Sequence, residues 1–331
     1  MMSLICTNII NIVKHLDVYA SDSDIKSCIP MKNNSGNLWA KQGGQSYVVK
    51  VKKNNREYAF RINFEQLSNE MMQRYDMLSK YLAANTLKYF IPFRFYPNSI
   101  TYQGIKYSPI LMDWVVTTNL KKHIKSHLQD KKAIKKLIED FLNLVEYLHS
   151  KRISHGDLHH NNIRVTQNGD LVLLDYDSVY ILGMEKFRDE CKGYKGYQHP
   201  FHREKNEFLS HKIDYYSELV IYISLKAIYE CPSIWDEYDL ENREDALTFD
   251  ASDYADIDNS KLFKHISSLS PELQKLCEIL RIYLNAEYLN SLMPLEEVLK
   301  SIVGKRFCII CGRELEHDEK YCIMCGTQRI D

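Results

Sequence analysis

Glycine and long apolar runs are both scarce in this chain of 331 residues. Only 12 residues are glycine, which excludes a glycine-rich, low-complexity chain. The longest apolar run, LVIYISLKAIY at 219–229, is too short to span a bilayer and is interrupted by Lys226, so it predicts a buried helix. The first residues, MMSLICTNIINIV, have no basic region and no small-residue cleavage site, so we expect neither a signal peptide nor membrane attachment.

An excess of charge of either sign is also missing. The formal net charge is -1, so nothing in the composition points to wholesale nucleic-acid binding. Hydrophobic residues make up 45% of the chain, which is enough for a sizeable core. The length suits one large two-lobed domain or two ordinary domains.

The cysteines do not form the pattern of a disulfide framework. Five of the nine are scattered and odd in number, which favours a reducing, cytoplasmic location. These are Cys6, Cys28, Cys191, Cys231 and Cys277.

The other four cysteines lie close together near the C-terminus. Cys308 and Cys311 form one C-x-x-C pair, and Cys322 and Cys325 form a second pair after ten intervening residues. Two such pairs place four thiolates tetrahedrally around zinc, so we predict a structural zinc ribbon over 304–331. Such a small module needs its metal to fold, and we expect it to dock a protein partner or the rest of the chain. The segment mixes acids with bases and has little aromatic surface, which argues against nucleic-acid binding.

Hydrophobic periodicity predicts that the first third is mostly sheet. Residues 1–40 form an N-terminal extension with a polar, turn-prone end. The segment SYVVKVKKNNREYAFRI at 46–62 predicts a hairpin that turns at KKNN. Residues 67–84 have helical spacing, and 100–115 predict two more strands with a turn near Gly104.

Helices dominate from about residue 117 onward. The strongest amphipathic pattern lies in KKAIKKLIEDFLNLVEYLHSKR. Helices are predicted over 131–152, 214–230 and 270–286. Short strands at NIRV and LVLLDY surround the turn QNGD, and the acidic stretch 238–258 is predicted to be a surface loop or insert.

The loop HGDLHHNNI at 155–163 carries the most distinctive polar residues. Asp157 and Asn162 lie in it five residues apart, and Asp175 ends the apolar run LVLL further on. Phosphoryl transfer uses one carboxylate to position the acceptor hydroxyl, and an amide with a second carboxylate to hold magnesium on the nucleotide phosphates. Magnesium prefers hard oxygen ligands, so Asn162 and Asp175 are the predicted magnesium ligands and Asp157 is the predicted base.

The ordered motifs resemble the protein kinase superfamily across roughly residues 40–300. His155, Asp157 and Asn162 match its H-x-D-x-x-x-x-N loop, and DYD at 175–177 stands where D-F-G is usual. Together with YQHP further along, these motifs are similar to those of bacterial kinase-like proteins, which often carry cysteine-rich tails.

Further segments extend the resemblance on both sides of that loop. YAFR ends at Arg61, which takes the position of the family's lysine, and ILMDWV at 110–115 resembles the hinge between the lobes. GYKGYQHP at 193–200 resembles the end of an activation segment. DYYSEL at 214–219 resembles the start of the helix whose aspartate braces the catalytic loop.

The resemblance implies an α+β fold with two lobes. The N-terminal lobe, an antiparallel sheet plus a helix, would cover 41–112, and the mostly helical C-terminal lobe would cover 113–303. ATP would lie beneath the sheet and against the hinge, with Arg61 holding its phosphates. The implied nucleotide contacts are Gly43, Val48, Arg61, Met112, Asp113, Val115 and His159.

The glycine-rich loop and the lysine position depart from the family pattern. Lys41, Gly43 and Ser46 fall at the three glycine positions, and only Gly43 is a glycine. Arg61 keeps the charge of the lysine but is planar and bulkier. Its partner on the following helix is predicted to be Glu70, with Asp76 as the alternative.

The catalytic loop departs from the family as well. Gly156 replaces the arginine that receives an activation-loop phosphate, so control by such phosphorylation is not expected. His159 replaces a lysine, and Asp177 replaces the glycine of D-F-G, as a loop cap or a second metal ligand. We expect His155 to brace the loop and His160 to be packed or solvated.

The resemblance implies a serine/threonine protein kinase that uses ATP and magnesium on a protein substrate. Two alternatives remain open. A small-molecule kinase of the aminoglycoside or choline type shares the glycine and histidine at 156 and 159. An inactive pseudokinase would serve as a scaffold.

Overall fold

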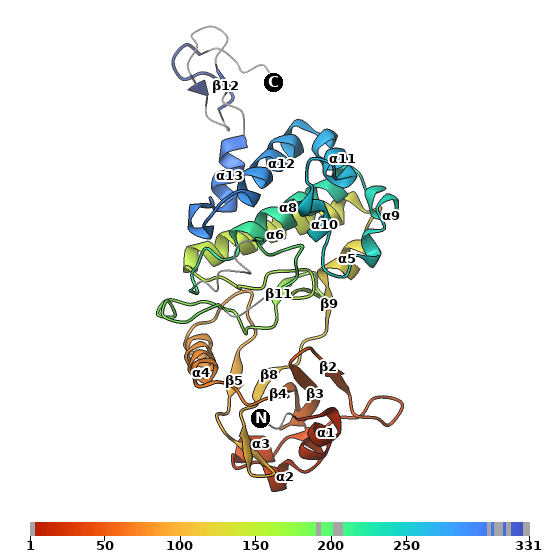
Figure 1. Cartoon of the computed structure of the whole chain (residues 1–331), viewed down its shortest axis with the longest axis vertical. Coiled ribbons are helices and arrows are strands. Elements are labelled where there is room, and N and C mark those ends of the chain that lie inside the picture. The colour runs from red at the N-terminus through yellow and green to blue at the C-terminus, as the bar shows by residue number, and fades with distance from the viewer. Residues whose placement is uncertain are drawn as a thin grey trace.

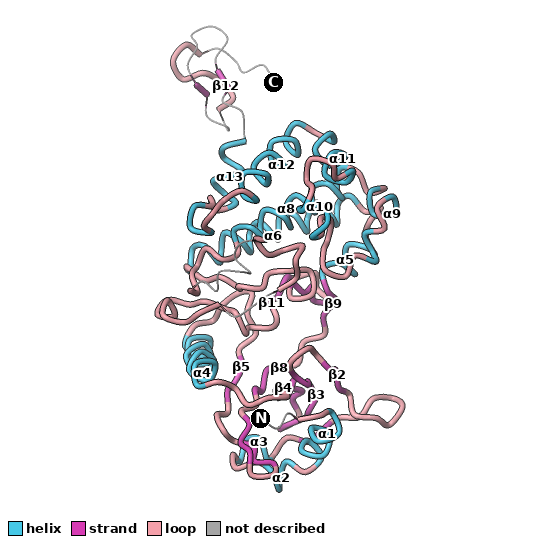
Figure 2. Tube along the Cα trace, in the orientation of Figure 1, coloured by secondary structure: helices cyan, strands magenta, loops and turns pink. Residues whose placement is uncertain are grey.

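The computed structural model describes residues 4–189, 193–200, 208–302, 306–307, 314–315 and 319–326. Figure 1 shows two lobes, with the chain passing from one to the other between β8 (Ile110–Asp113) and β9 (Thr117–Asn119). Strands dominate the N-terminal lobe and helices dominate the C-terminal lobe (Figure 2). The predicted two-lobed α+β architecture is therefore confirmed.

The N-terminal lobe contains a six-stranded antiparallel sheet. Its strand order is β1-β3-β4-β8-β5, and β2 pairs with the first half of β3. The strands are β1 (Ile29–Pro30), β2 (Ala40–Gln42), β3 (Ser46–Lys53), β4 (Arg56–Asn63), β5 (Phe93–Phe95) and β8. The predicted KKNN hairpin is confirmed, because Asn54 and Asn55 have φ values of 47° and 62°, as a two-residue hairpin turn requires.

The segment predicted as two strands over 100–115 forms three. β6 (Ile100–Tyr102) and β7 (Ile105–Tyr107) form a hairpin of their own that turns at Gly104, and β8 joins the main sheet. The break falls at Pro109, which has no N–H group for a continuous ladder.

The N-terminal extension folds onto the sheet. It forms α1 (Cys6–Lys14), α2 (Leu16–Tyr19) and α3 (Ser23–Lys26). Ile9 and Ile12 of α1 are fully buried and belong to one apolar cluster with Val49 of β3 and Phe60 of β4. The extension therefore covers a sheet face that would otherwise expose aliphatic and aromatic side chains to water.

One helix, α4 (Asn69–Ala84), follows β4, the strand that contains Arg61. α4 begins at Ser68, whose side chain accepts a hydrogen bond from the Met71 N–H and caps the helix. Its buried residues include Tyr75 and Leu78, so this face of α4 lies toward the cleft between the lobes.

The C-terminal lobe is built around two long helices. The helices are α5 (Leu120–Ser126), α6 (Lys131–Lys151), α8 (Tyr215–Glu230), α9 (Ile234–Glu237), α10 (Ala251–Ala255), α11 (Lys261–Leu269), α12 (Pro271–Leu284) and α13 (Leu295–Ile302). α8 is buried on nearly all sides, which confirms the prediction that the apolar run at 219–229 forms a buried helix. Over the described residues, no helix combines the length and apolar character that a membrane crossing needs.

A small sheet separates these helices from the cleft. β9 pairs with β10 (Ile163–Thr166), which pairs with β11 (Leu171–Leu173), all antiparallel. The turn between β10 and β11 contains Gly169, as the QNGD motif predicts. The loop 155–162 lies between α6 and β10, so these elements fix both of its ends.

The acidic stretch 238–258 lies partly on the surface, as predicted, but it is folded and partly buried instead of being an irregular loop. It includes the short 3-10 helix η1 (Leu240–Asn242) and α10, and the four side chains of 246–249 are each 0% exposed. The loop part of the prediction was wrong because the many acids make the stretch polar on average, and the apolar run at 246–249 is too short to show a helical or strand period.

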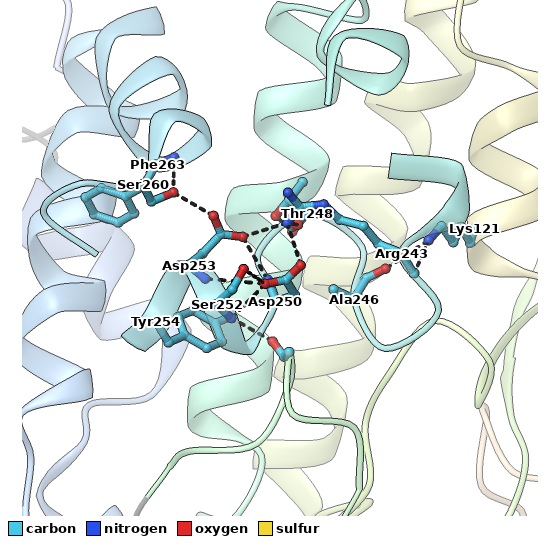
Figure 3. Close-up of polar contacts among 12 residues, drawn as sticks. Lys121, Arg243, Ala246, Thr248, Asp250, Ser252, Asp253, Tyr254, Ser260 and Phe263 are labelled. Atoms are coloured by element: carbon cyan, nitrogen blue, oxygen red, sulfur yellow. Dashed lines mark hydrogen bonds and ion pairs between the residues drawn. The ribbon is translucent and has the colours of Figure 1, made fainter. Parts of the chain in front are cut away.

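Ion pairs within the stretch compensate its acids. Arg243 Nη1 lies 2.6 Å from Asp253 Oδ2 and 3.2 Å from Asp250 Oδ2. Figure 3 shows these residues together with Lys121 and Ala246. The Lys121 ammonium group of α5 donates a hydrogen bond to the Ala246 carbonyl at 3.0 Å. The segment is therefore tied to the helix that follows the link between the lobes.

The C-terminal cysteine segment is described only in part. β12 (Arg306–Phe307) pairs with β13 (Glu314–Leu315), while Cys308 and Cys311 lie outside the described residues. Cys322 is buried and Cys325 is exposed, and the Gly326 N–H donates to the Cys322 carbonyl at 2.7 Å, which closes a tight turn. The described residues alone contain no cluster of metal ligands, so the zinc site stays a prediction.

Candidate active site

Two backbone-directed contacts hold the start of the catalytic loop. Asp214, directly before α8, accepts hydrogen bonds from the backbone N–H groups of His155 and Gly156. The fully buried His155 ring donates from Nε2 to the Leu174 carbonyl at 2.9 Å and accepts from the Asp157 N–H at 3.3 Å. Burial lowers the pKa of His155 to about 4, so the ring is neutral and acts as the expected brace.

Gly156 occupies a position that only glycine fits. Its φ is +78°, and a Cβ atom there would lie 2.3 Å from the Ser178 carbonyl oxygen. The loop therefore packs directly against the backbone that follows Asp177. This contact gives a structural reason for the absence of an arginine at this position.

The structure brings Asp157 and Asn162 together across the loop. The Asn162 amide nitrogen donates to the Asp157 carbonyl oxygen at 2.9 Å and lies 3.3 Å from its Oδ2. His159 Nε2 also lies 3.3 Å from Asp157 Oδ2. Because the amide nitrogen of Asn162 is engaged, its amide oxygen is the atom left to bind a cation.

Asp175 follows β11 and lies beside the catalytic loop, because the N–H group of the preceding Leu174 donates to the Asn162 carbonyl oxygen at 3.0 Å. Its φ is +66°, a strained value for a residue other than glycine, and 52% of its side chain is exposed to the cleft. Desolvation and the Asp177 carboxylate raise the pKa of Asp175 to about 6, with a smaller contribution from Asp157. Such crowding of carboxylates is relieved by a divalent cation, so Asn162 and Asp175 fit the predicted magnesium site.

Tyr176 anchors this turn in the core. It takes the place of the family's phenylalanine. The centre of its ring lies 5.4 Å from the ring centre of Phe90 and 6.0 Å from that of Phe93. Its hydroxyl donates to the Leu173 carbonyl at 2.8 Å and accepts from the Ile91 N–H at 2.8 Å. The carboxylates on either side of Tyr176 therefore extend from a fixed backbone.

Arg61 reaches this acidic turn from β4. Its two terminal nitrogens lie 2.6 and 2.5 Å from the two Asp177 oxygens, and Nη1 lies 3.5 Å from Asp175 Oδ1. Nε donates to the Ser46 hydroxyl at 3.0 Å, and Nη1 donates to the Tyr75 hydroxyl at 3.1 Å.

The predicted helix partner of Arg61 is wrong. Glu70 accepts a hydrogen bond from the Arg188 N–H at 3.1 Å, while Asp76 pairs with Lys80 one turn along α4. The residue of α4 that contacts Arg61 is Tyr75, and the carboxylate comes from Asp177, 116 residues away. Sequence reasoning assigned Asp177 to a cap or a metal ligand because its distance from Arg61 along the chain hides the pairing.

The first predicted nucleotide contacts lie at the β2–β3 turn and on the neighbouring strands β3 and β4. Gly43 is in the turn between β2 and β3 and donates to the Ser46 carbonyl at 2.8 Å. Val48 pairs with Arg61 across β3 and β4. Gly43 and Arg61 are thus linked through Ser46, a contact that the sequence did not indicate.

The link between the lobes contains the remaining predicted contacts. Met112 is half-buried in β8, where it pairs with Ala59 of β4, and Asp113 ends the strand. Val115 lies between β8 and β9 and is 36% exposed. These positions form the hinge segment against which the family resemblance predicts that ATP lies.

The two remaining histidines have different environments. His160 is buried, its Nδ1 lies 2.6 Å from the Tyr197 hydroxyl, and burial lowers its pKa to about 3, which confirms a packing role. The His159 ring lies 4.5 Å from the ring of Tyr194. His159 therefore contacts the activation segment as well as Asp157, and its approach to phosphate stays a prediction.

The end of the activation segment is held beside Asp157. Gln198 Nε2 donates to the Gly156 carbonyl at 3.3 Å, and the Tyr254 hydroxyl donates to the Gly196 carbonyl at 2.7 Å. Gly196 is enclosed, because a Cβ atom there would lie 2.6 Å from the Asp245 carbonyl oxygen. The segment 238–258 thus supports the backbone that flanks the catalytic loop.

A family model described as the protein kinase domain matches residues 41–285, which is most of the chain. The chain belongs to the protein kinase family. The match begins at β2 and ends beyond α12, so it includes the catalytic loop, Asp175 and the acidic segment of this kinase. No match was found among curated proteins.

Proposed function

We propose that this kinase is an active serine/threonine protein kinase that uses ATP and magnesium. The observation that carries the proposal is the placement of Asp157, Asn162 and Asp175 around one side of the cleft, with Arg61 3.5 Å from Asp175. The strained backbone at Asp175, with a φ of +66°, also supports the proposal, because such residues cluster at active sites.

Each residue has one role in the proposed reaction. Arg61 binds the nucleotide phosphates, while Asn162 and Asp175 hold magnesium, which neutralises charge on those phosphates when it is bound. Asp157 orients the substrate hydroxyl toward the γ-phosphorus and accepts its proton as the new P–O bond forms and the bond to the ADP oxygen breaks. His155 and Asp214 keep the backbone of Asp157 in place.

The supported backbone at 193–200 favours a protein substrate. Three elements hold this segment next to the catalytic loop, through Gln198, Tyr254 and the His199 Nε2 contact with the Tyr283 carbonyl at 2.7 Å. A fixed main chain beside the base offers an extended peptide a surface on which to bind. The alternative acceptor, a small alcohol or an aminoglycoside, is favoured by Gly156 and His159.

The test is transfer of labelled phosphate from ATP to general protein substrates, compared with small alcohols and aminoglycosides. We expect labelled serine or threonine in protein, and a loss of at least about 100-fold in the Asp157→Asn and Asp175→Asn variants. Labelling of the small molecules alone would identify the alternative. No transfer above the level of both variants would identify a scaffold.

We also propose that Cys308, Cys311, Cys322 and Cys325 bind one zinc ion as a structural ribbon that docks a protein partner. The C-x-x-C spacing supports this, as does the turn that Gly326 closes onto Cys322. Elemental analysis of the purified chain should find one zinc per molecule, and a chain without zinc would contradict the assignment.

A further inference from the structure

Two departures from the family pattern meet in one contact. Arginine replaces lysine at residue 61, aspartate replaces glycine at residue 177, and the two side chains form a pair with N–O distances of 2.6 and 2.5 Å. The planar guanidinium group makes two parallel bonds to a carboxylate, which an ammonium group does not. Arg61 therefore gains a carboxylate that accepts two hydrogen bonds, and Asp177 gains a cation that neutralises its charge.

The environment of Arg61 requires a carboxylate at this place. Its side chain is only 16% exposed, and an unpaired charge at that depth is strongly destabilising. In protein kinases the helix after this strand normally supplies the partner as a glutamate. Here that helix supplies Tyr75, an uncharged hydroxyl, so the negative charge at the Arg61 guanidinium group comes mainly from Asp177.

The helix holds Asp177 instead of holding Arg61 directly. The Tyr75 hydroxyl donates to Asp177 Oδ1, and Arg74 Nη2 donates to the Asp177 carbonyl oxygen at 2.5 Å. Asp177 is also followed by Ser178, whose backbone packs against Gly156. The carboxylate is thereby fixed from α4 and from the catalytic loop.

We propose that Asp177 is the positioning residue for Arg61 and replaces the helix glutamate of the family. The anchor of the phosphate-binding cation then lies two residues from the metal ligand Asp175, on one fixed turn. The two requirements of the family, a held cation and a placed metal carboxylate, depend here on a single segment. α4 acts on Arg61 chiefly through Asp177, because Tyr75 and Arg74 of this helix both bind that residue.

This inference builds on the proposed function, but its test does not depend on turnover. The affinity for magnesium-ATP is measured by calorimetric titration on the full chain for Asp177→Asn, Arg61→Met and the double variant. We expect each single variant to bind at least about 10-fold more weakly, because a cation that is misplaced by 1 Å loses much of its effect. The double variant should match Arg61→Met, since Asp177 acts through Arg61.

Further variants separate the possible roles of Asp177. Asp177→Glu keeps the charge and should restore part of the affinity, while Glu70→Gln is the matched control and should bind as the parent does. The magnesium concentration for half-maximal binding should stay the same in Asp177→Asn. A rise in that concentration, or an additive loss in the double variant, would show a metal ligand and overturn the proposal.

Folding is followed by thermal unfolding of every variant. If Asp177→Asn does not fold, the pairing predicts that Arg61→Met restores folding in the double variant, because both charges are then removed. Failure of that rescue would count against the pair. A parent chain that binds magnesium-ATP without transferring phosphate would refute the proposed function and leave the binding comparison intact.

Discussion

Replacement of Gly156 by alanine should separate backbone strain from packing in the catalytic loop. The residue has a φ of +78°, and the added Cβ atom would lie 2.3 Å from the Ser178 carbonyl oxygen. Gly169 is a matched control, because its φ is +87° and no atom lies within 4 Å of its Cβ position. Both substitutions incur the left-handed backbone cost of roughly 1–2 kcal/mol, and only Gly156→Ala adds a clash.

The clash sets the size of the expected difference. Forcing one additional methyl group into a filled site costs about 1–3 kcal/mol, so Gly156→Ala should be less stable than Gly169→Ala by that amount. Displacement of the adjoining Asp157 by about 1 Å should also lower phosphate transfer about 100-fold. Gly156→Arg, which restores the family's residue, should be worse still on both measures.

Urea unfolding of the three variants and the parent checks the stability difference, and labelled-phosphate transfer checks the rate. Equal free energies of unfolding for Gly156→Ala and Gly169→Ala would refute the packing argument. Normal transfer by Gly156→Ala would show that the contact with Ser178 does not position Asp157.

Three further predictions concern other parts of the chain. Burial lowers the pKa of His149, but Glu218 and Glu296 outweigh it and raise the pKa to about 9. The charged histidine therefore stabilises the fold fully below pH 6.5, and this stabilisation is lost as the pH rises to 9. The free energy of unfolding, measured in urea, should fall over that pH range in the parent and not in His149→Gln. Tyr254→Phe removes the hydrogen bond to Gly196, so KM for a protein substrate should rise several-fold while KM for ATP stays constant, and a change in both would point to general unfolding. Treatment with a zinc chelator, or Cys322→Ser, should expose the tail to protease without shifting the melting of the kinase lobes, and an unchanged digestion pattern would count against the proposed zinc-dependent tail.

The sequence predicted those parts of the fold that rest on local patterns. The 3.6-residue spacing in 131–152 and the asparagine pair at the β3–β4 turn both correspond to observed elements. The H-x-D-x-x-x-x-N spacing placed Asp157 and Asn162, because a loop of that length folds back on itself and one amide bonds its own backbone.

The features that the sequence did not predict depend on contacts between distant residues. Asp177 meets Arg61 across 116 positions, and no local pattern distinguishes a pairing carboxylate from a cap. Residues 246–249 are buried because the lobe leaves space for them, although their neighbours are mostly acidic. The helices of the first 40 residues cover one face of the sheet, and their polar flanks concealed that role.

Transfer of labelled phosphate from ATP by the parent chain and by Asp157→Asn tests the central claim most directly. Binding of magnesium-ATP, measured in parallel, should be similar for the two proteins, because Asp157 acts on the acceptor hydroxyl. The account predicts labelled serine or threonine in a protein substrate with the parent chain, and a loss of at least about 100-fold with the variant. Equal transfer by both proteins, or none by a parent chain that binds the nucleotide, would contradict it.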